Sequence, residues 1–277
     1  MISRVLSREL AVNSTWVALL INAISAGAGA LIGLAWRRFD KWRKSRGHRA
    51  ILAGLDAPMI FVFPPRDVVG RTLPQTAVED FLAINNVISA FLRVGRQPPE
   101  KIRDHDFLGE AEKRHSSLVL ICAPKSNKVT GEALDLLQTG GKYPPHLVPR
   151  FESLPGKPDQ WQIRWNHAVW PSPSYDQKGR LEDVAFILKV QSPWAGQHKI
   201  LIVAGIRGIG TWGAAEMLKK WWEPLHDKKG HSRRHGTTKQ GDFVAMVRVT
   251  YEASDIKRVE LLALEDLDRV DSQLRGR

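Results

Sequence analysis

The chain has 277 residues, 43% of them hydrophobic, and a formal net charge of +12. This composition supports a packed core and excludes an intrinsically disordered protein. Its single cysteine, Cys122, excludes an intramolecular disulfide framework and fits a reducing compartment. The positive charge suits a nucleic acid, an anionic ligand or a membrane surface, so its place along the chain decides among them.

The first informative segment is an apolar run without charge, WVALLINAISAGAGALIGLAW, from Trp16 to Trp36. A helix of about 20 residues is about 30 Å long, which is the thickness of a bilayer's hydrocarbon core. Tryptophans at both ends are typical of the membrane interface. We therefore expect an N-terminal tail (1–15) followed by a single transmembrane helix (16–36). A buried soluble helix and a cleaved signal peptide are the alternatives.

A basic juxtamembrane segment, residues 37–57, follows the span. The tail offers Arg4 and Arg8, whereas the segment after the span is far richer in cations. These cations are Arg37, Arg38, Lys41, Arg43, Lys44, Arg46 and Arg49. This asymmetry predicts an N-terminus outside and a cytoplasmic domain at 58–277. Contact with anionic lipid explains part of the charge, so we do not expect a nucleic-acid partner.

Small residues recur within the span at Ser25, Gly29 and Gly33. This spacing lets helix backbones approach closely and favours a homo-oligomer in the membrane. The alternative is an alanine- and glycine-rich span whose pattern has no such role.

Three segments of the following domain have the pattern of strand, loop and helix. Strands are expected at 59–65, 118–122 and 200–204, and helices at 78–92, 129–138 and from about Thr211. Near-continuous apolar strands favour a parallel sheet, and the apolar runs at 182–190, 243–251 and 258–265 add antiparallel pairs. The fold class is therefore α/β, a Rossmann-like mixed sheet with helices on both faces. A connector rich in proline and glycine near 140–160 marks a possible sub-boundary.

A glycine loop follows the third strand. Gly208, Gly210 and Gly213 have the spacing G-x-G-x-x-G, with Thr211 among them. The loop resembles Rossmann-type phosphate-binding loops, and this resemblance implies a nucleotide or similar phosphorylated ligand. The sequence departs from the Rossmann-type pattern in two ways, so NAD is not established as the ligand and the cofactor is unknown. The motif lies in the last third of the chain, and a basic loop (226–241) replaces the strand that would end in an acid. Glycines required only for packing are the alternative.

The loops after the first two strands carry further candidate ligand-binding residues. Lys125, Ser126 and Asn127 follow the second strand, and Arg66 follows the first. Open α/β sheets bind ligands outside the carboxyl ends of their strands, where these loops would meet the glycine loop. Asn127 is also a suitable helix N-cap, and Arg66 could simply be solvated.

Candidates for catalysis are weaker. Glu132 and Glu216 lie near helix starts, where acids commonly interact with the helix dipole. Cys122 fits a buried filler better than a nucleophile. Asp104 and Asp106 flank a histidine without a recognisable metal-ligand cluster, so no metal is expected.

The combined pattern predicts a membrane-anchored cytoplasmic sensor or effector that binds a nucleotide or phosphorylated ligand. Its layout is similar to that of membrane-anchored nucleotide sensors in bacterial defence, which is an analogy of architecture alone. Two alternatives stay open at this point. One is an anchored enzyme acting on a nucleotide or NAD-like substrate, and the other is an anchored scaffold that binds a protein.

Overall fold

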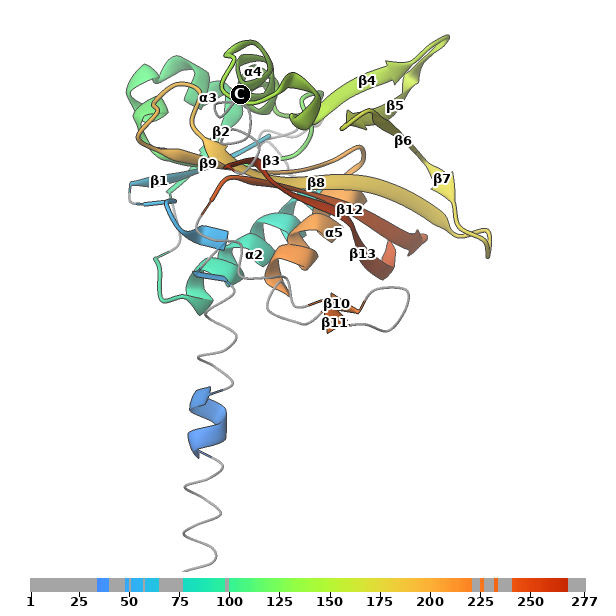
Figure 1. Cartoon of the computed structure of the whole chain (residues 1–277), viewed down its shortest axis with the longest axis horizontal. Coiled ribbons are helices and arrows are strands. Elements are labelled where there is room, and N and C mark those ends of the chain that lie inside the picture. Colours follow the sequence, from blue (N-terminus) through green and yellow to red (C-terminus); the bar gives the residue numbers. More distant parts are fainter. Residues whose placement is uncertain are drawn as a thin grey trace, which may run out of the picture. The chain divides into compact units, whose positions relative to one another are not determined.

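A computed structural model describes the main part of the chain (Figure 1). The described residues are 34–39, 48–49, 51–56, 58–64, 77–97, 100–220, 225–226, 232–233 and 241–268. The chain divides into two compact units, Met1–Ser45 and Arg46–Arg277. In the first unit, residues 34–39 are helical, and the ring centroids of Trp36 and Phe39 are 6.2 Å apart.

The proposed span falls mostly outside these residues, as do Ser25, Gly29, Gly33 and Arg66. Among the residues that are described, no helix has the length and apolar character needed to cross a membrane. The transmembrane helix at 16–36 therefore stays a prediction from the sequence.

The second unit is built on a mixed sheet with the strand order β13-β12-β8-β9-β3-β1-β2, and β7 pairs with β8. The strands are β1 (Met59–Phe63), β2 (Glu100–Arg103), β3 (Ser117–Ile121), β7 (Ser174–Tyr175), β8 (Leu181–Gln191), β9 (Lys199–Gly205), β12 (Phe243–Glu252) and β13 (Asp255–Asp266). Strands β9, β3, β1 and β2 are parallel, and the remaining pairs are antiparallel. The predicted α/β class with a mixed sheet is confirmed.

Helices cover both faces of this sheet (Figure 1). They are α2 (Val78–Arg93), α3 (Asp104–Gly109), α4 (Lys128–Thr139) and α5 (Gly208–Lys219), with short 3-10 helices η1 (Ala111–His115) and η2 (Pro145–Leu147). Helices α2 and α5 lie against one face and α3 and α4 against the other. A separate sheet of β4 (Arg150–Leu154), β5 (Lys157–Trp165) and β6 (Ala168–Ser172) packs into the same core as α4. Strands β10 (Leu225–His226) and β11 (Ser232–Arg233) form a third sheet.

The apolar strands contribute side chains to two cores, because successive side chains of a strand point to opposite faces of the sheet. Val119 and Leu201, which are register partners, pack with α2 and α5. Their neighbours Leu118 and Ile200 pack with α4. Each of these fully buried side chains contributes about 1.5–3 kcal/mol relative to exposure, so a strand buried on both sides has to be apolar throughout.

Some elements differ from the sequence prediction. Strand β2 and helix α3 were not expected. Strand β2 is short and charged and lies at the sheet edge, where an apolar run is not required. Helix α5 begins at Gly208 and not at about Thr211. The glycine motif therefore lies inside the helix and not in a loop before it.

Candidate functional site

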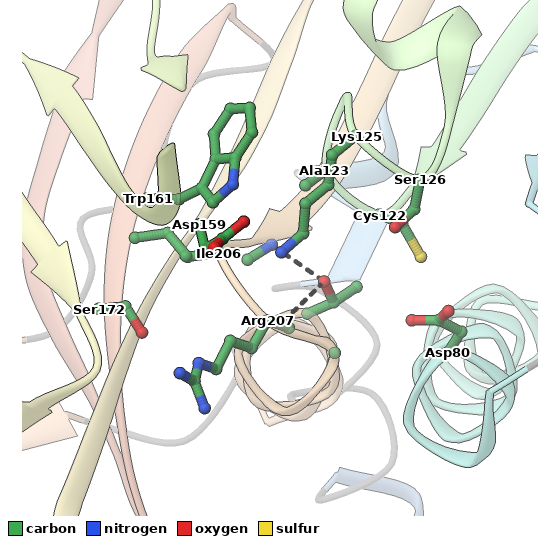
Figure 2. Close-up of a pocket in the computed structure, with 13 residues that line it drawn as sticks. Asp80, Cys122, Ala123, Lys125, Ser126, Asp159, Trp161, Ser172, Ile206 and Arg207 are labelled. Atoms are coloured by element: carbon green, nitrogen blue, oxygen red, sulfur yellow. Dashed lines mark hydrogen bonds between the residues drawn. The ribbon is translucent and has the colours of Figure 1, made fainter. Parts of the chain in front are cut away.

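A cavity of about 320 Å³ opens at the carboxyl ends of β3 and β9 (Figure 2). Its walls come from both strand-helix loops, the first turn of α2 and the β4–β6 sheet. It is lined by Asp80, Cys122, Ala123, Lys125, Ser126, Asp159, Trp161, Ser172, Gly205, Ile206, Arg207, Gly208 and Thr211. We call this cavity the edge pocket. Open α/β sheets bind ligands outside the carboxyl ends of their strands, so the edge pocket lies where a binding site is expected.

Four of the predicted ligand-binding residues line the edge pocket: Lys125, Ser126, Gly208 and Thr211. The others that the structure describes, Asn127, Gly210 and Gly213, do not line it, and Arg66 lies outside the described residues. The structure therefore brings the loops after β3 and β9 together as expected, but it divides the glycine motif.

The start of α5 already holds an anionic group of this chain. The backbone amides of Arg207 and Gly210 donate hydrogen bonds to Oδ2 of Asp183, at 3.0 and 2.9 Å. Oδ1 accepts from the amide of Val184 at 2.9 Å. Asp183 lies on β8 and is fully buried. Its carboxylate occupies the place at a helix N-terminus where Rossmann-type loops bind a phosphate.

Burial raises the pKa of Asp183 to about 6, because a carboxylate loses hydration in the interior. The amides of Arg207, Val184 and Gly210 act in the opposite direction by donating to the charged form. At neutral pH the group is therefore an anion that these amides stabilise, and it titrates closer to neutrality than an ordinary aspartate.

Close packing explains two of the three motif glycines. A Cβ atom at Gly210 would lie 2.3 Å from Oδ2 of Asp183, and one at Gly213 would lie 2.3 Å from Cγ2 of Val249. Real Cβ atoms do not approach other atoms so closely, so either position requires glycine. Gly208 differs, because its hypothetical Cβ would lie 3.1 Å from Cβ of Glu79, beside the pocket.

Thr211 joins β9 to α5. Its Oγ1 accepts from the amide of Gly205 at 2.9 Å and lies 3.4 Å from the carbonyl oxygen of Arg207. A Cβ at Gly205 would lie 2.4 Å from the backbone nitrogen of Thr211, so this turn is tight. The hydroxyl fixes the backbone from which the Arg207 side chain extends.

Asn127 caps α4 and links two strands. Its Oδ1 accepts from the amides of Val129 and Thr130 at 3.1 and 3.2 Å. Its Nδ2 donates to the carbonyl oxygens of Val62 on β1 and Ile121 on β3, at 3.2 and 2.8 Å. The expected capping role is thus present, and the buried amide fills the gap between β1 and β3, where the strand order reverses.

The polar lining of the edge pocket is mixed in charge. Lys125 and Arg207 supply two cations, and Asp80 and Asp159 supply two acids. Asp80 is 1% exposed and lies in the first turn of α2. The ammonium nitrogen of Lys125 lies 5.9 Å from the ring centroid of Trp161, within the range of a cation–π contact.

Sequence reasoning missed several lining residues, among them Asp80, Asp159, Trp161 and Arg207. Trp161, Ile163 and Trp165 alternate along β5, as side chains of one strand face do, but no local signal in the sequence places this strand over the pocket. Arg207 could have been found, because it immediately precedes the glycine motif that was singled out.

Cys122 is buried, as expected, and packs in the apolar cluster with α2. Its φ angle of 84° lies in the left-handed region that favours glycine. Its amide donates to the carbonyl oxygen of Val203 at 3.0 Å, which continues the β3–β9 pairing for one residue. The loop that follows lines the edge pocket with Ala123, Lys125 and Ser126.

The two candidate catalytic acids have structural partners away from the edge pocket. Oε1 of Glu132 accepts from Nε1 of Trp194 at 3.0 Å and lies 3.3 Å from the Arg114 guanidinium. Oε1 of Glu216 accepts from Nδ2 of Asn86 at 3.0 Å, between α5 and α2. Neither residue lines the pocket.

Asp104 likewise has structural partners. Its Oδ2 accepts from the amide of Lys128 at 3.1 Å, next to the Asn127 cap, and its Oδ1 accepts from the amide of His105 at 2.8 Å. Within the described ranges, no group of three or more metal-ligating side chains is found.

No known family model matches this chain, and no curated protein is similar to it at a significant level. The geometry of the edge pocket is therefore the basis for assigning a function.

The first prediction concerns Gly210. Gly210→Ala should lower the free energy of unfolding by about 1–3 kcal/mol, because the added methyl group displaces the Asp183 carboxylate from its amide donors. The measurement is chemical denaturation of the full-length protein. Gly109→Ala is the matched control, since no atom lies within 4 Å of a Cβ at that position. In an Asp183→Ala background the same Gly210 change should cost less, and equal costs in both backgrounds would refute the contact.

Proposed function

We propose that this chain binds a nucleotide or a similar phosphorylated ligand in the edge pocket. The observation that carries the proposal is the convergence of two cations on one cavity. Lys125 comes from the loop after β3 and Arg207 from the loop after β9. Charged donors at the carboxyl edge of a sheet suit a phosphate group, and hydrogen bonds between a phosphate and lysine or arginine are among the strong ones.

The phosphate would be bound by side chains and not by the amide of Gly210. That amide and the amide of Arg207 already donate to Asp183. A second anion at the same amides would have to displace a buried carboxylate or lie against it. Lys125 and Arg207 bring side-chain donors from two different loops to the pocket wall, so they are the groups assigned to the phosphate.

The acids of the edge pocket indicate that the ligand is more than a phosphate. Asp80 and Asp159 would repel a bare anion but accept hydrogen bonds from hydroxyl or amino groups. Trp161 adds an aromatic surface on which a base can stack. A nucleotide carries an anionic group, donors and a planar base in one molecule, and it therefore suits this lining better than inorganic phosphate does.

The anchor completes the proposal. The uncharged run at 16–36 and the basic segment after it support a single span with the α/β unit in the cytoplasm. Ser25, Gly29 and Gly33 would allow spans of several copies to pack, and ligand occupancy could then be reported through assembly. In this role the protein is a sensor or effector at the membrane. The enzyme alternative is less well supported, because the two acids considered for catalysis, Glu132 and Glu216, do not line the edge pocket.

The second prediction tests the ligand. Purified full-length protein, titrated by calorimetry with a panel of nucleotides and sugar phosphates, should bind at least one nucleotide. Lys125→Gln and Arg207→Gln should each weaken that binding about tenfold or more, since a charged hydrogen bond contributes about 1.5–3 kcal/mol.

Lys257→Gln is the control, because Lys257 lies on β13 and pairs with Asp255. It should leave the affinity unchanged. No binding across the panel, or binding that both pocket variants leave intact, would reject the proposed site and favour the protein-binding scaffold.

The third prediction tests the anchor. A reporter fused after Arg277 should be active only when it is of the kind that works in the cytoplasm, and the protein should resist carbonate extraction from membranes. A variant with Leu20→Arg and Leu31→Arg places two charges in the span and should become extractable. Recovery of the unmodified chain in the soluble fraction would show that 16–36 is not a membrane span.

A further inference from the structure

A second cavity, of about 270 Å³, lies on the β4–β6 sheet beside η2. It is lined by Pro145, His146, Val148, Arg150, Arg164 and His167. We call it the histidine-arginine cleft. All of its polar lining side chains are imidazoles or guanidiniums, whereas the edge pocket has cations and acids in equal number.

The cleft is distinct from the edge pocket because β5 uses its two faces differently. Ile163 and Trp165 are buried in the core, and Trp161, of the same parity, lines the edge pocket. Arg164 is exposed and has the opposite parity. A ligand in the cleft would therefore contact none of the residues that line the edge pocket.

Two guanidiniums are held next to each other in the cleft. Arg150 on β4 and Arg164 on β5 are direct register partners, and like charges at such positions destabilise a sheet. Arg164 donates to both carboxylate oxygens of Glu152, each at 3.0 Å. Arg150 donates to Oε1 of Gln138, a neutral amide, at 2.7 and 3.0 Å. Among the described residues, Arg164 is thus paired with a carboxylate and Arg150 with a neutral amide, so the cleft keeps a positive charge.

Two imidazoles are stacked at the same place. The ring centroids of His146 and His167 are 4.9 Å apart, with an angle of 18° between the planes. The β5–β6 turn sets this stack, because the amide of Asn166 donates to the carbonyl oxygen of His146 at 2.7 Å.

We propose that the histidine-arginine cleft binds a phosphate-type oxyanion. A guanidinium presents paired donors that match a phosphate or sulfate, and imidazole N–H groups can donate to the remaining oxygens. Such an anion would offset the repulsion between Arg150 and Arg164. A divalent metal, which a histidine pair could otherwise bind, would lie beside two permanent positive charges. The cleft therefore selects anions, either as free phosphate or as a small phosphate ester.

Histidine ring signals of the labelled full-length protein, followed by NMR at constant ionic strength, test this site. Inorganic phosphate should shift the His146 and His167 signals saturably, with assignments from His146→Gln and His167→Gln. Methyl phosphate, titrated in parallel, separates the two sources. A response to phosphate alone identifies a site for the free ion, and a response to both identifies a site that admits esters.

Variants decide whether the cleft is responsible. Arg150→Gln with Arg164→Gln should weaken the phosphate response about tenfold or more. Arg258→Gln on β13 is the control, since Arg258 is also exposed and pairs with Glu260. Lys125→Gln with Arg207→Gln should leave the response intact, which separates this site from the edge pocket. Unshifted His146 and His167 signals, an undiminished response in the double cleft variant, or a response to Zn²⁺ in place of phosphate would each overturn the proposal.

Discussion

The hydrogen bonds between the Asp183 carboxylate and the start of α5 are the constraint on which the site depends. A helix N-terminus has amides without partners in the helix and a partial positive charge, so an acceptor has to be found for them. In this protein the acceptor comes from β8, the neighbour of β9 in the sheet. Burial without these donors would make the charged form of Asp183 costly, and the helix start without the carboxylate would leave amides unpaired. Each group therefore fixes the position of the other.

Several features follow from that pair. Gly210 must be glycine because Oδ2 of Asp183 lies where its side chain would be. Arg207 precedes the helix with its amide held by the same oxygen, so its side chain extends from a fixed backbone at the pocket edge. Thr211 bonds the turn from the other side. A sequence spacing that resembles a phosphate loop thus serves here to place a helix on a sheet, and the anion binding that we propose falls to neighbouring side chains.

The sequence was most informative where burial dictates composition. Strands such as β3 are covered on both faces and must be apolar, so periodicity and length sufficed to find them. Strand β2 was not predicted, because an edge strand can be charged. The start of α5 was predicted about three residues late, because the glycines suggested a loop. Asp183 carried a usable signal, since an acid inside the run EDVAFILKV has to find buried donors. The location of those donors, and of Trp161 over the pocket, depends on long-range packing that spacing does not encode.

The most direct test is an NMR titration of the Arg207 and Gly210 amides in the full-length protein between pH 4 and 8. If both donate to Asp183, their proton and nitrogen signals should move together with a midpoint near pH 6, where the carboxyl titrates. A nucleotide bound to Lys125 and Arg207 should leave the Gly210 signal nearly unchanged. Amides that titrate separately would show that Asp183 does not occupy the helix start. A Gly210 signal that shifts strongly when a nucleotide binds would show that the helix start binds the ligand.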